Sequence, residues 1–425
     1  MKDTAYLPRV IDSMLELYLQ TFGCVCIEGP KWCGKTMTGL HHANSSVFIA
    51  DPAGQYQNRR LAEMTPEILL SGGTPRLIDE WQEVPSLWDA VRFHVDMTPG
   101  KGQFILTGSA TPNRKGILHS GTGRIATLRM RPMSLFESGE STGDVSLKGL
   151  FDGDIPQQTV TPPSLRKLAS YIVRGGWPGS LPYSEEQAAL LPKQYINTLL
   201  ANDLERMDSS PRDITKMKLL LRSLARNEST AASARVLIRD VRDRDAEDIH
   251  PTTVSAYLDL FSRLFLTENQ PPFATGVRSS VRVKQAEKRH FCDPSLAASL
   301  LGISADGLIG DLETFGFLFE ALCERDLRIY AESFGATLFH YQDYKDREID
   351  AVIELDDGRW GAFEIKLGAN QIDAAAESLL RIKTEFDSDP KGRPPSLLCV
   401  LCGLTNAAYR RPDGVFVIPL TALRN

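Results

Sequence analysis

A short loop at residues 29–36, GPKWCGKT, limits the folds open to this 425-residue chain more than any other segment. It fits the pattern GxxxxGK followed by Ser or Thr, and it lies between an apolar, strand-like run and a helix-compatible segment. Glycines let a backbone wrap closely around phosphates, so that successive N–H groups point at the anion, and a helix N-terminus adds partial positive charge. The sequence therefore predicts a P-loop that binds a nucleotide.

The residues of this loop have separate predicted roles. Lys35 would bridge the β- and γ-phosphates of ATP, and the hydroxyl group of Thr36 would hold Mg²⁺. The backbone of the loop would surround the nucleotide, and its predicted binding residues are Gly29, Pro30, Lys31, Trp32, Cys33, Gly34, Lys35 and Thr36.

Three further segments contain groups that hydrolysis of ATP requires. The apolar run at 76–80 ends in two acids, of which Asp79 is predicted to serve the Mg²⁺ site and Glu80 to act as the base that polarises water. Thr107 ends the next apolar run and is predicted to orient that water. Arg124 opens the following run, where it either offers its guanidinium group to a phosphate or is an ordinary solvated arginine.

Short apolar runs alternate with longer helix-compatible segments across residues 1–140, which predicts a parallel sheet with helices on both faces. Residues 141–162 are rich in Ser, Gly, Asp, Thr and Pro, and they are typical of a linker or an extended crossing segment. Helical spacing then dominates residues 163–270, and residues 315–425 return to a mixture of helix and strand. The expected strands of the first part are Cys24–Glu28, Val47–Asp51, Arg76–Asp79, Gln103–Thr107 and Ile125–Met130.

The motifs, taken in order, resemble a large family of prokaryotic AAA-type ATPases. The matching segments are YLPR at 6–9, GPKWCGKT, LIDEWQ, FILTGS, GR and RPMSLFES, and later ones such as GGWP at 175–178 extend the resemblance over nearly the whole chain. The C-terminal half of this family is known as a domain of unknown function. Trp32 departs from the pattern, because it is bulkier than the residue expected in the loop.

The resemblance implies a definite order of domains. It implies an AAA-type ATPase domain, then a winged-helix-like segment, then a domain like the PD-(D/E)XK restriction endonucleases. Together with the residue patterns, it predicts an α/β fold with a P-loop AAA-type ATPase domain at 1–140, a linker and helical winged-helix-like domain at 141–290, and a nuclease-like α/β domain at 291–425.

The helical middle has the spacing of a helix-turn-helix arrangement, with helices expected at 216–226, 233–240 and 252–265. Residues 212–290 hold 15 Lys and Arg against 10 Asp and Glu, a balance of +5 in a chain of net charge −6. This basic region favours contact with DNA phosphates, although a winged helix that binds a protein partner has the same pattern. The basic residues expected on the wing are Arg278, Arg282, Lys284, Lys288 and Arg289.

Near the C-terminus, residues 347–366 are predicted to form a β-hairpin. Asp356, Asp357 and Gly358 suit a three-residue loop, which would pair Leu355 with Arg359. Counting outward from the loop places Asp350 opposite Glu364. Alternation along the strands assigns both acids and Lys366 to one face, and Ile349, Ala351, Ile353, Phe363 and Ile365 to the other.

Two carboxylates this close repel each other, which favours a shared cation such as Mg²⁺ or Mn²⁺. Asp350 and Glu364 are therefore predicted metal ligands, Lys366 is predicted to assist cleavage of a phosphodiester, and Glu320 is a candidate third carboxylate. The pattern is that of PD-(D/E)XK nucleases. A structural hairpin with salt-bridged charges, or a site that has lost its activity, is the alternative.

Composition excludes several other classes of protein. The seven cysteines are scattered, and the pair at Cys399 and Cys402 lies in an apolar run without a second pair, so buried reduced thiols are expected rather than a zinc site. The N-terminus has no apolar signal region and no segment is apolar enough for a membrane span, so a cytoplasmic location and no membrane partner are expected.

The function expected from the sequence is ATP binding and hydrolysis coupled to work on DNA, such as branched or damaged DNA, with a metal-dependent nuclease-like domain. DNA is the expected partner and a homo-oligomer the expected assembly. The alternative is a regulatory or defence-associated ATPase whose C-terminal domains bind a protein partner without cutting.

Overall fold

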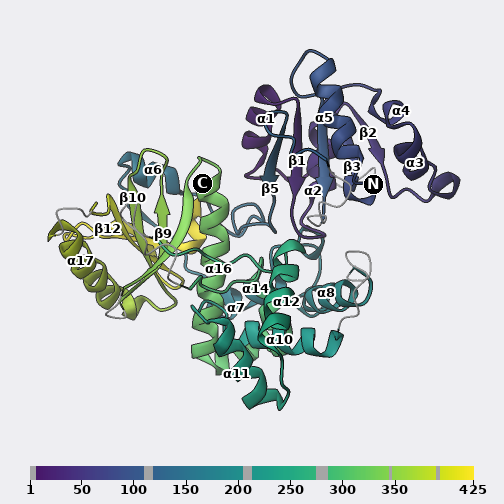
Figure 1. Ribbon diagram of the computed structural model, residues 1–425. Helices are drawn as coiled ribbons and strands as arrows, with labels where there is room; N and C mark the ends of the chain where they lie inside the picture. The colour runs from purple at the N-terminus through teal and green to yellow at the C-terminus, as the bar shows by residue number, and fades with distance from the viewer. Residues whose placement is uncertain (1–5, 110–117, 204–212, 274–285, 344–346, 389–392) are drawn as a thin grey trace. The chain divides into compact units, whose positions relative to one another are not determined.

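The computed structural model describes the chain except residues 1–5, 110–117, 204–212, 274–285, 344–346 and 389–392 (Figure 1). The chain divides into two compact units. Among the described residues, the first unit contains the chain up to Pro132 together with Asp259–Leu266, and the second unit contains the remainder.

A five-stranded parallel sheet forms the centre of the first unit, with the strand order β2-β3-β4-β1-β5. One apolar cluster joins Val25, Ile27 and Ile105 of the sheet to Leu15 of the first helix. Another cluster joins Cys26, Ile78 and other sheet residues to the helices that follow β2 and β3. Helices therefore pack on both faces of the sheet, as the alternation of elements predicts (Figure 1). The elements are α1 Asp12–Thr21, β1 Cys24–Glu28, α2 Lys35–His42, β2 Ser45–Phe48, α3 Ala53–Met64, α4 Pro66–Leu70, β3 Arg76–Asp79, α5 Leu87–Met97, β4 Phe104–Gly108 and β5 Ile125–Arg129.

The five strands expected in this region are confirmed, with small differences in their ends. β1 and β3 have the predicted bounds, and β4 and β5 differ by one residue. β2 begins two residues early and ends at Phe48, because the N–H group of Asp51 turns back to the carbonyl oxygen of Phe48 at 3.4 Å.

The helical part of the chain contains the three helices expected for a helix-turn-helix arrangement, α10, α11 and α12. Side chains cap two of them: Asp213 accepts from the N–H group of Lys216, and Ser233 accepts from that of Val236. The last residues of α12 belong to the first unit. The helices of this part are α7 Leu165–Arg174, α8 Glu185–Thr198, α10 Ile214–Arg226, α11 Ala234–Asp245, α12 Pro251–Arg263, α14 Pro294–Leu301, α15 Ala305–Gly310 and α16 Leu312–Glu332.

A seven-stranded mixed sheet, in the order β7-β12-β13-β11-β10-β9-β8, is the other main feature of the second unit. Helices α16 and α17 lie on either side of it in Figure 1, and α17 buries Ile372, Ala375 and Leu379 against Trp360 and its neighbours. The elements are β6 Val145–Ser146, α6 Leu147–Asp152, β7 Gln158–Thr159, β8 Thr337–Gln342, β9 Glu348–Glu354, β10 Trp360–Lys366, α17 Ile372–Ser388, β11 Leu397–Cys402, β12 Ala407–Arg410, β13 Phe416–Pro419 and β14 Leu423–Arg424.

Residues 141–162, expected to be either a linker or an extended crossing segment, form a crossing segment. Within 141–162, β7 adds an edge strand to the seven-stranded sheet by pairing with β12. β6 pairs with β14 at the C-terminus, and the Ser141 hydroxyl donates to the carbonyl oxygen of Leu423 at 2.7 Å. Because these strands are two residues long and their partners lie far away in sequence, no local sequence pattern predicts them.

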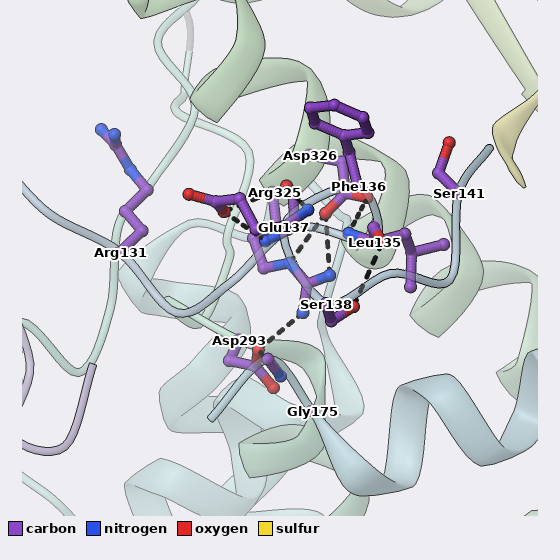
Figure 2. Close-up of polar contacts among 12 residues, drawn as sticks. Arg131, Leu135, Phe136, Glu137, Ser138, Ser141, Gly175, Asp293, Arg325 and Asp326 are labelled. Atoms are coloured by element: carbon purple, nitrogen blue, oxygen red, sulfur yellow. Dashed lines mark hydrogen bonds and ion pairs between the residues drawn. The ribbon is translucent and has the colours of Figure 1, made fainter. Parts of the chain in front are cut away.

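A buried ion-pair cluster holds residues 133–138 against α16 (Figure 2). Asp326 accepts from the N–H group of Leu135 at 2.9 Å, and Asp293 accepts from that of Gly176 at 2.9 Å. Arg325 donates to both carboxylates at 2.8 Å. Gly176 has no room for a side chain, because a Cβ atom would lie 2.1 Å from the Met133 carbonyl oxygen. Residues 133–140, which the sequence analysis grouped with the ATPase domain, are therefore packed in the second unit.

Candidate functional sites

The P-loop joins the carboxyl end of β1 to the N-terminus of α2. Gly34 caps α2 in the left-handed region, with φ of 108°. Gly29 is required for a different reason: a Cβ atom there would lie 2.0 Å from the Met130 carbonyl oxygen. Trp32 also has a positive φ of 65°, and its side chain is 57% exposed. The loop thus has the glycine-dependent backbone that the motif predicts.

Lys35 is buried inside this loop. Its ammonium group donates to the carbonyl oxygens of Gly29 at 2.9 Å and Pro30 at 2.7 Å. Carbonyl oxygens are weaker partners for an ammonium group than phosphate oxygens, because hydrogen bonds between ionised groups are the stronger ones. The Lys35 side chain is therefore placed where a bound phosphate would be a better acceptor than the loop itself.

Asp79 joins two hydroxyl groups at the carboxyl edge of the sheet. Its Oδ1 atom accepts from Thr36 Oγ1 at 2.8 Å and from Thr107 Oγ1 at 2.7 Å. Burial raises the pKa of Asp79, although both hydroxyl groups oppose the shift. Residues predicted separately on α2, β3 and β4 thus meet at one point. Oxygen donors of this kind suit Mg²⁺.

Glu80 follows directly and has an unusual backbone. Its φ of 57° and ψ of 47° lie in the left-handed region, which is uncommon for a residue other than glycine. Its carboxylate accepts from the Ser109 hydroxyl at 3.0 Å and from the amide group of Gln82. Its own N–H group donates to Thr107 at 3.2 Å. Gln82 was given no role from the sequence, although it ends the LIDEWQ segment of the resemblance.

Arg124 does not lie at this site within its own chain. It precedes β5, and Cys24, the first residue of β1, donates its N–H group to the Arg124 carbonyl oxygen at 3.1 Å. The P-loop follows the last residue of β1, so the two lie at opposite edges of the sheet, roughly 15 Å apart for a five-residue strand. The Arg124 guanidinium group pairs with Asp96 at 2.7 Å. The structure therefore places Arg124 away from the P-loop of its own chain.

Arg9 is a residue of this site that the sequence analysis left without a role. Its side chain is buried, and it donates to the carbonyl oxygen of Cys33 in the P-loop at 2.7 Å and to that of Arg131 at 2.8 Å. It thereby ties the P-loop to the segment that leaves β5. The segment YLPR was part of the resemblance, but its order alone did not indicate this contact.

A second cluster, called here the acidic site, consists of Glu320, Asp350, Glu364, Lys366 and Lys288. Lys366 Nζ lies 3.2 Å from Asp350 Oδ2 and 2.7 Å from Glu364 Oε2. Lys288 Nζ lies 2.6 Å from Glu320 Oε1 and 4.0 Å from Asp350 Oδ1. The predicted carboxylates therefore do come together, and each contacts an ammonium group.

The pKa values in the acidic site follow from burial and from these pairs. Burial raises the pKa of Glu320 to about 7 and also raises that of Glu364 to about 7, the latter helped by the charge of Asp350. Burial acts in the same direction on Asp350, but Lys366 and Lys288 hold the pKa of that carboxyl below its usual value. The net effect keeps Asp350 ionised between the two lysines.

The hairpin register agrees with the prediction. Leu355 donates to Arg359 at 2.9 Å, Gly358 has φ of 85°, and the strand pairs run from Trp360↔Glu354 to Phe363↔Ala351. The next position differs from a plain ladder, because the Asp350 side chain accepts from the N–H group of Ile365 at 2.7 Å.

The face that carries Asp350, Glu364 and Lys366 is polar only at one end of the hairpin. Val352, Trp360 and Ala362 alternate with the predicted apolar residues and are buried in the cluster that includes α17. Both faces of this sheet are therefore covered, and the charged residues lie only at one end of the strands.

Two of the basic residues expected on the wing, Lys288 and Arg289, are not exposed side chains on a wing surface. Lys288 is 4% exposed and faces the acidic site, so it cannot be a phosphate contact on a wing surface. Arg289 is partly buried and donates to the Ala232 carbonyl oxygen at 3.0 Å. Arg278, Arg282 and Lys284 lie outside the described residues.

Among the residues that the structure describes, no group of three or more His, Cys, Asp or Glu side chains is arranged to hold a metal ion. In the same part of the chain, all seven cysteines are free and buried, as expected. No helix within the described ranges combines the length and the apolarity needed to cross a membrane.

Comparison with known families divides the chain into three matched regions. Residues 21–138 match the family model of an AAA domain. Residues 165–307 and 315–423 match two domains of unknown function, DUF8612 and DUF4143 respectively. The N-terminal region is thus an AAA-type ATPase domain, and it is followed by C-terminal domains whose functions are unknown.

Individual relatives add little about function. Uncharacterised proteins of Mycobacterium tuberculosis and Mycobacterium bovis are each 25% identical over 80% of this chain and 70% of their own length. A Walker-type ATPase of Pyrococcus abyssi, 12% identical, covers 70% of this chain and 96% of its own with a TM-score of 0.42. The ORC2 protein of Aeropyrum pernix, 15% identical, covers 73% of this chain and 96% of its own with a TM-score of 0.33. These TM-scores are too low to establish a shared fold.

Proposed function

We propose that this chain binds ATP with Mg²⁺ at the P-loop and hydrolyses it. The observation that carries the proposal is the meeting of Thr36, Asp79 and Thr107 beside the buried Lys35, with hydrogen bonds of 2.8 and 2.7 Å to a single carboxylate oxygen. Oxygen donors from α2 and β3 fit a Mg²⁺ ion, which would neutralise charge on the β- and γ-phosphate oxygens.

Lys35, Glu80 and Thr107 would have separate roles in ATP hydrolysis. Lys35 would exchange its two loop carbonyl partners for phosphate oxygens. Glu80 would accept a proton from the attacking water, and Ser109 and Gln82 hold its carboxylate in one orientation. Thr107, which contacts both Asp79 and the N–H group of Glu80, would keep the two acids in register.

The test is ATP turnover and nucleotide binding by the full chain carrying Lys35→Ala. Turnover should fall to background, because the charge that holds the β- and γ-phosphates is removed. Lys101→Ala, which removes an exposed lysine of the same unit, is the matched control and should behave like the wild type. Undiminished turnover by folded Lys35→Ala protein would refute the proposal.

We propose as a second function that the acidic site cleaves DNA phosphodiesters with Mg²⁺ or Mn²⁺. The supporting observation is that the carboxylates of Asp350 and Glu364 share the Lys366 ammonium group, with Glu320 nearby. Lys366, which is 26% exposed, would stabilise the negative charge on the non-bridging oxygens of the phosphate that is attacked. The carboxylates pair with lysines in the described arrangement, so they would hold the metal only after it replaced those partners, and the bound metal would supply an activated water.

The test of this second proposal is a Mn²⁺-dependent cleavage assay with single-stranded, duplex and branched DNA. Lys366→Met should abolish cleavage, whereas Lys383→Met, at an exposed ion pair on α17, should leave it unchanged. If no DNA is cut but DNA still binds with a strong dependence on salt, the C-terminal region binds phosphates without cutting. If DNA neither binds nor is cut, the alternative of a regulatory ATPase with a protein partner is favoured.

A further inference from the structure

The ammonium group of Lys288 occupies the interior of the acidic site. It donates to Glu320 at 2.6 Å and lies 4.0 Å from Asp350, and its side chain is only 6% exposed. Glu320 comes from α16 and Asp350 from β9, so Lys288 links the two elements that contribute these carboxylates. A lysine is seldom buried unless its charge is compensated, and here two carboxylates compensate it.

The backbone of Lys288 is held in place independently of its side chain. Its N–H group donates to the Gln270 carbonyl oxygen at 2.9 Å, and its own carbonyl oxygen accepts from the Gln270 N–H group at 2.9 Å. The side-chain amide of Gln270 in turn donates to the carbonyl oxygens of Phe339 at 2.8 Å and Asp350 at 3.2 Å. Gln270 therefore fixes the backbone of Lys288 beside β8 and β9, so the Lys288 side chain starts from a fixed point next to the acidic site.

The charges of the site leave little attraction for another cation. Three carboxylates, of Glu320, Asp350 and Glu364, face two ammonium groups, of Lys288 and Lys366. A divalent ion between Glu320 and Asp350 would stand beside a buried positive charge that already contacts both of them. Like charges at such short distances repel strongly in a site with little water.

We propose that Lys288 is the resident cation of the acidic site and excludes divalent metal from the position between Glu320 and Asp350. Loading of metal at that position then requires the Lys288 ammonium group to leave. This inference rests on the proposal that the acidic site is where metal-dependent cleavage occurs, and it adds a device that keeps the site closed to metal. Its consequence is that DNA cleavage by this domain requires metal to displace the Lys288 ammonium group first.

Lys366 provides a matched comparison, because it is the other lysine of the site. It contacts Asp350 and Glu364 rather than Glu320, and it is more exposed than Lys288. Removing Lys366 lowers the positive charge of the site by the same amount, but it leaves Lys288 between Glu320 and Asp350. A specific role for Lys288 is therefore separable from a general effect of charge.

The experiment measures Mn²⁺ binding to the full chain without nucleotide, by electron paramagnetic resonance of free Mn²⁺ and by the shift in melting temperature. All proteins carry Lys35→Ala, which limits interference from the P-loop. Lys288→Met should bind Mn²⁺ at least about tenfold more tightly than the Lys35→Ala parent and should gain melting temperature with Mn²⁺. Addition of Asp350→Asn should remove that gain, and Lys366→Met should resemble the parent.

Three results would overturn the inference: the parent binds Mn²⁺ as tightly as Lys288→Met, Lys288→Met binds none, or Lys366→Met gains as much. Should Lys288→Met fail to fold, Lys288→Gln removes the charge while keeping a donor for Glu320, and the same criteria apply. DNA cleavage is measured on the same samples. Tighter Mn²⁺ binding without cleavage would support the role of Lys288 and count against the cleavage proposal alone.

Discussion

Single residues with strained or buried positions carry most of the chemistry in this chain. Glu80 adopts a left-handed backbone directly after β3, and its carboxylate accepts from Ser109 and Gln82. A strained residue whose side chain is also held by two neighbours is typical of a group that acts on a bound ligand. The sequence indicated the acid but neither the strain nor one of the two partners.

Glu80→Gln should separate ATP binding from hydrolysis. The amide keeps the shape of the side chain but cannot accept a proton, so we expect kcat to fall by about 100-fold or more while ATP still binds. Glu83→Gln, three residues away, is the control, because Glu83 pairs with Arg59 at 3.6 Å. Turnover and ATP binding are measured together. A loss of turnover in Glu83→Gln but not in Glu80→Gln would show that Glu83, and not Glu80, is the base.

His340 makes the second unit sensitive to acid. Burial lowers its pKa to about 4, and the charge of Lys288 adds to the effect. Between pH 6.5 and 4 the unfolded chain binds a proton that the folded chain does not, so this group lowers the free energy of unfolding as the pH falls, by up to about 3 kcal/mol. His340→Gln should remove that part of the pH dependence, measured by urea unfolding at several pH values. His119→Gln, at an exposed histidine, should leave the profile unchanged.

Elements in this protein are joined by buried ion pairs as well as by apolar contacts. Arg325 of α16 pairs with Asp293, which caps α14, and with Asp326, which accepts from the N–H group of Leu135. All three charged side chains are almost fully buried. This cluster holds the segment after Pro132 against α16 within the second unit, although the RPMSLFES motif in the sequence indicated only a resemblance (Figure 2).

Arg325→Met should destabilise the second unit strongly. The change leaves two buried carboxylates without their cation, which typically costs about 3–5 kcal/mol when one partner of a buried pair is removed. We expect a clear fall in the melting temperature followed by circular dichroism. Lys383→Met removes the solvent-exposed Lys383–Asp387 pair at 2.7 Å on α17 and should change stability by about 0.5 kcal/mol or less. Equal effects of the two changes would contradict a structural role for the buried cluster.

At the scale of the whole molecule, the position of Arg124 bears on whether the chain assembles into a homo-oligomer. Its guanidinium group lies at the edge of the sheet away from its own P-loop and pairs with the exposed Asp96. An arginine that cannot reach its own nucleotide can act only on the nucleotide of another copy, as in ATPases that supply this residue in trans. The predicted role of Arg124 therefore requires the predicted homo-oligomer.

A mixing experiment tests this assembly. Lys35→Ala protein lacks the phosphate contact and Arg124→Ala protein lacks the guanidinium group, so a mixture should recover part of the ATP turnover that neither has alone. Sedimentation of the wild type with ATP measures the assembly directly. Normal turnover by Arg124→Ala, or full activity in a strictly monomeric enzyme, would rule out the role in trans.

Local sequence was sufficient wherever function depends on residues close together in the chain. The P-loop, the acids after β3 and the register of the hairpin all follow from spacing, because a turn with glycine at a fixed place leaves one way to continue the strand or helix. Lys288 and Arg325 could not be placed this way. Lys288 pairs with Glu320 and Asp350, which lie 32 and 62 residues away, and Arg325 pairs with Asp293, which lies 32 residues away. Asp326, next to Arg325, binds the backbone of Leu135, 191 residues away. Only packing buries these lysine and arginine side chains, and burial makes them structural cations instead of solvated charges.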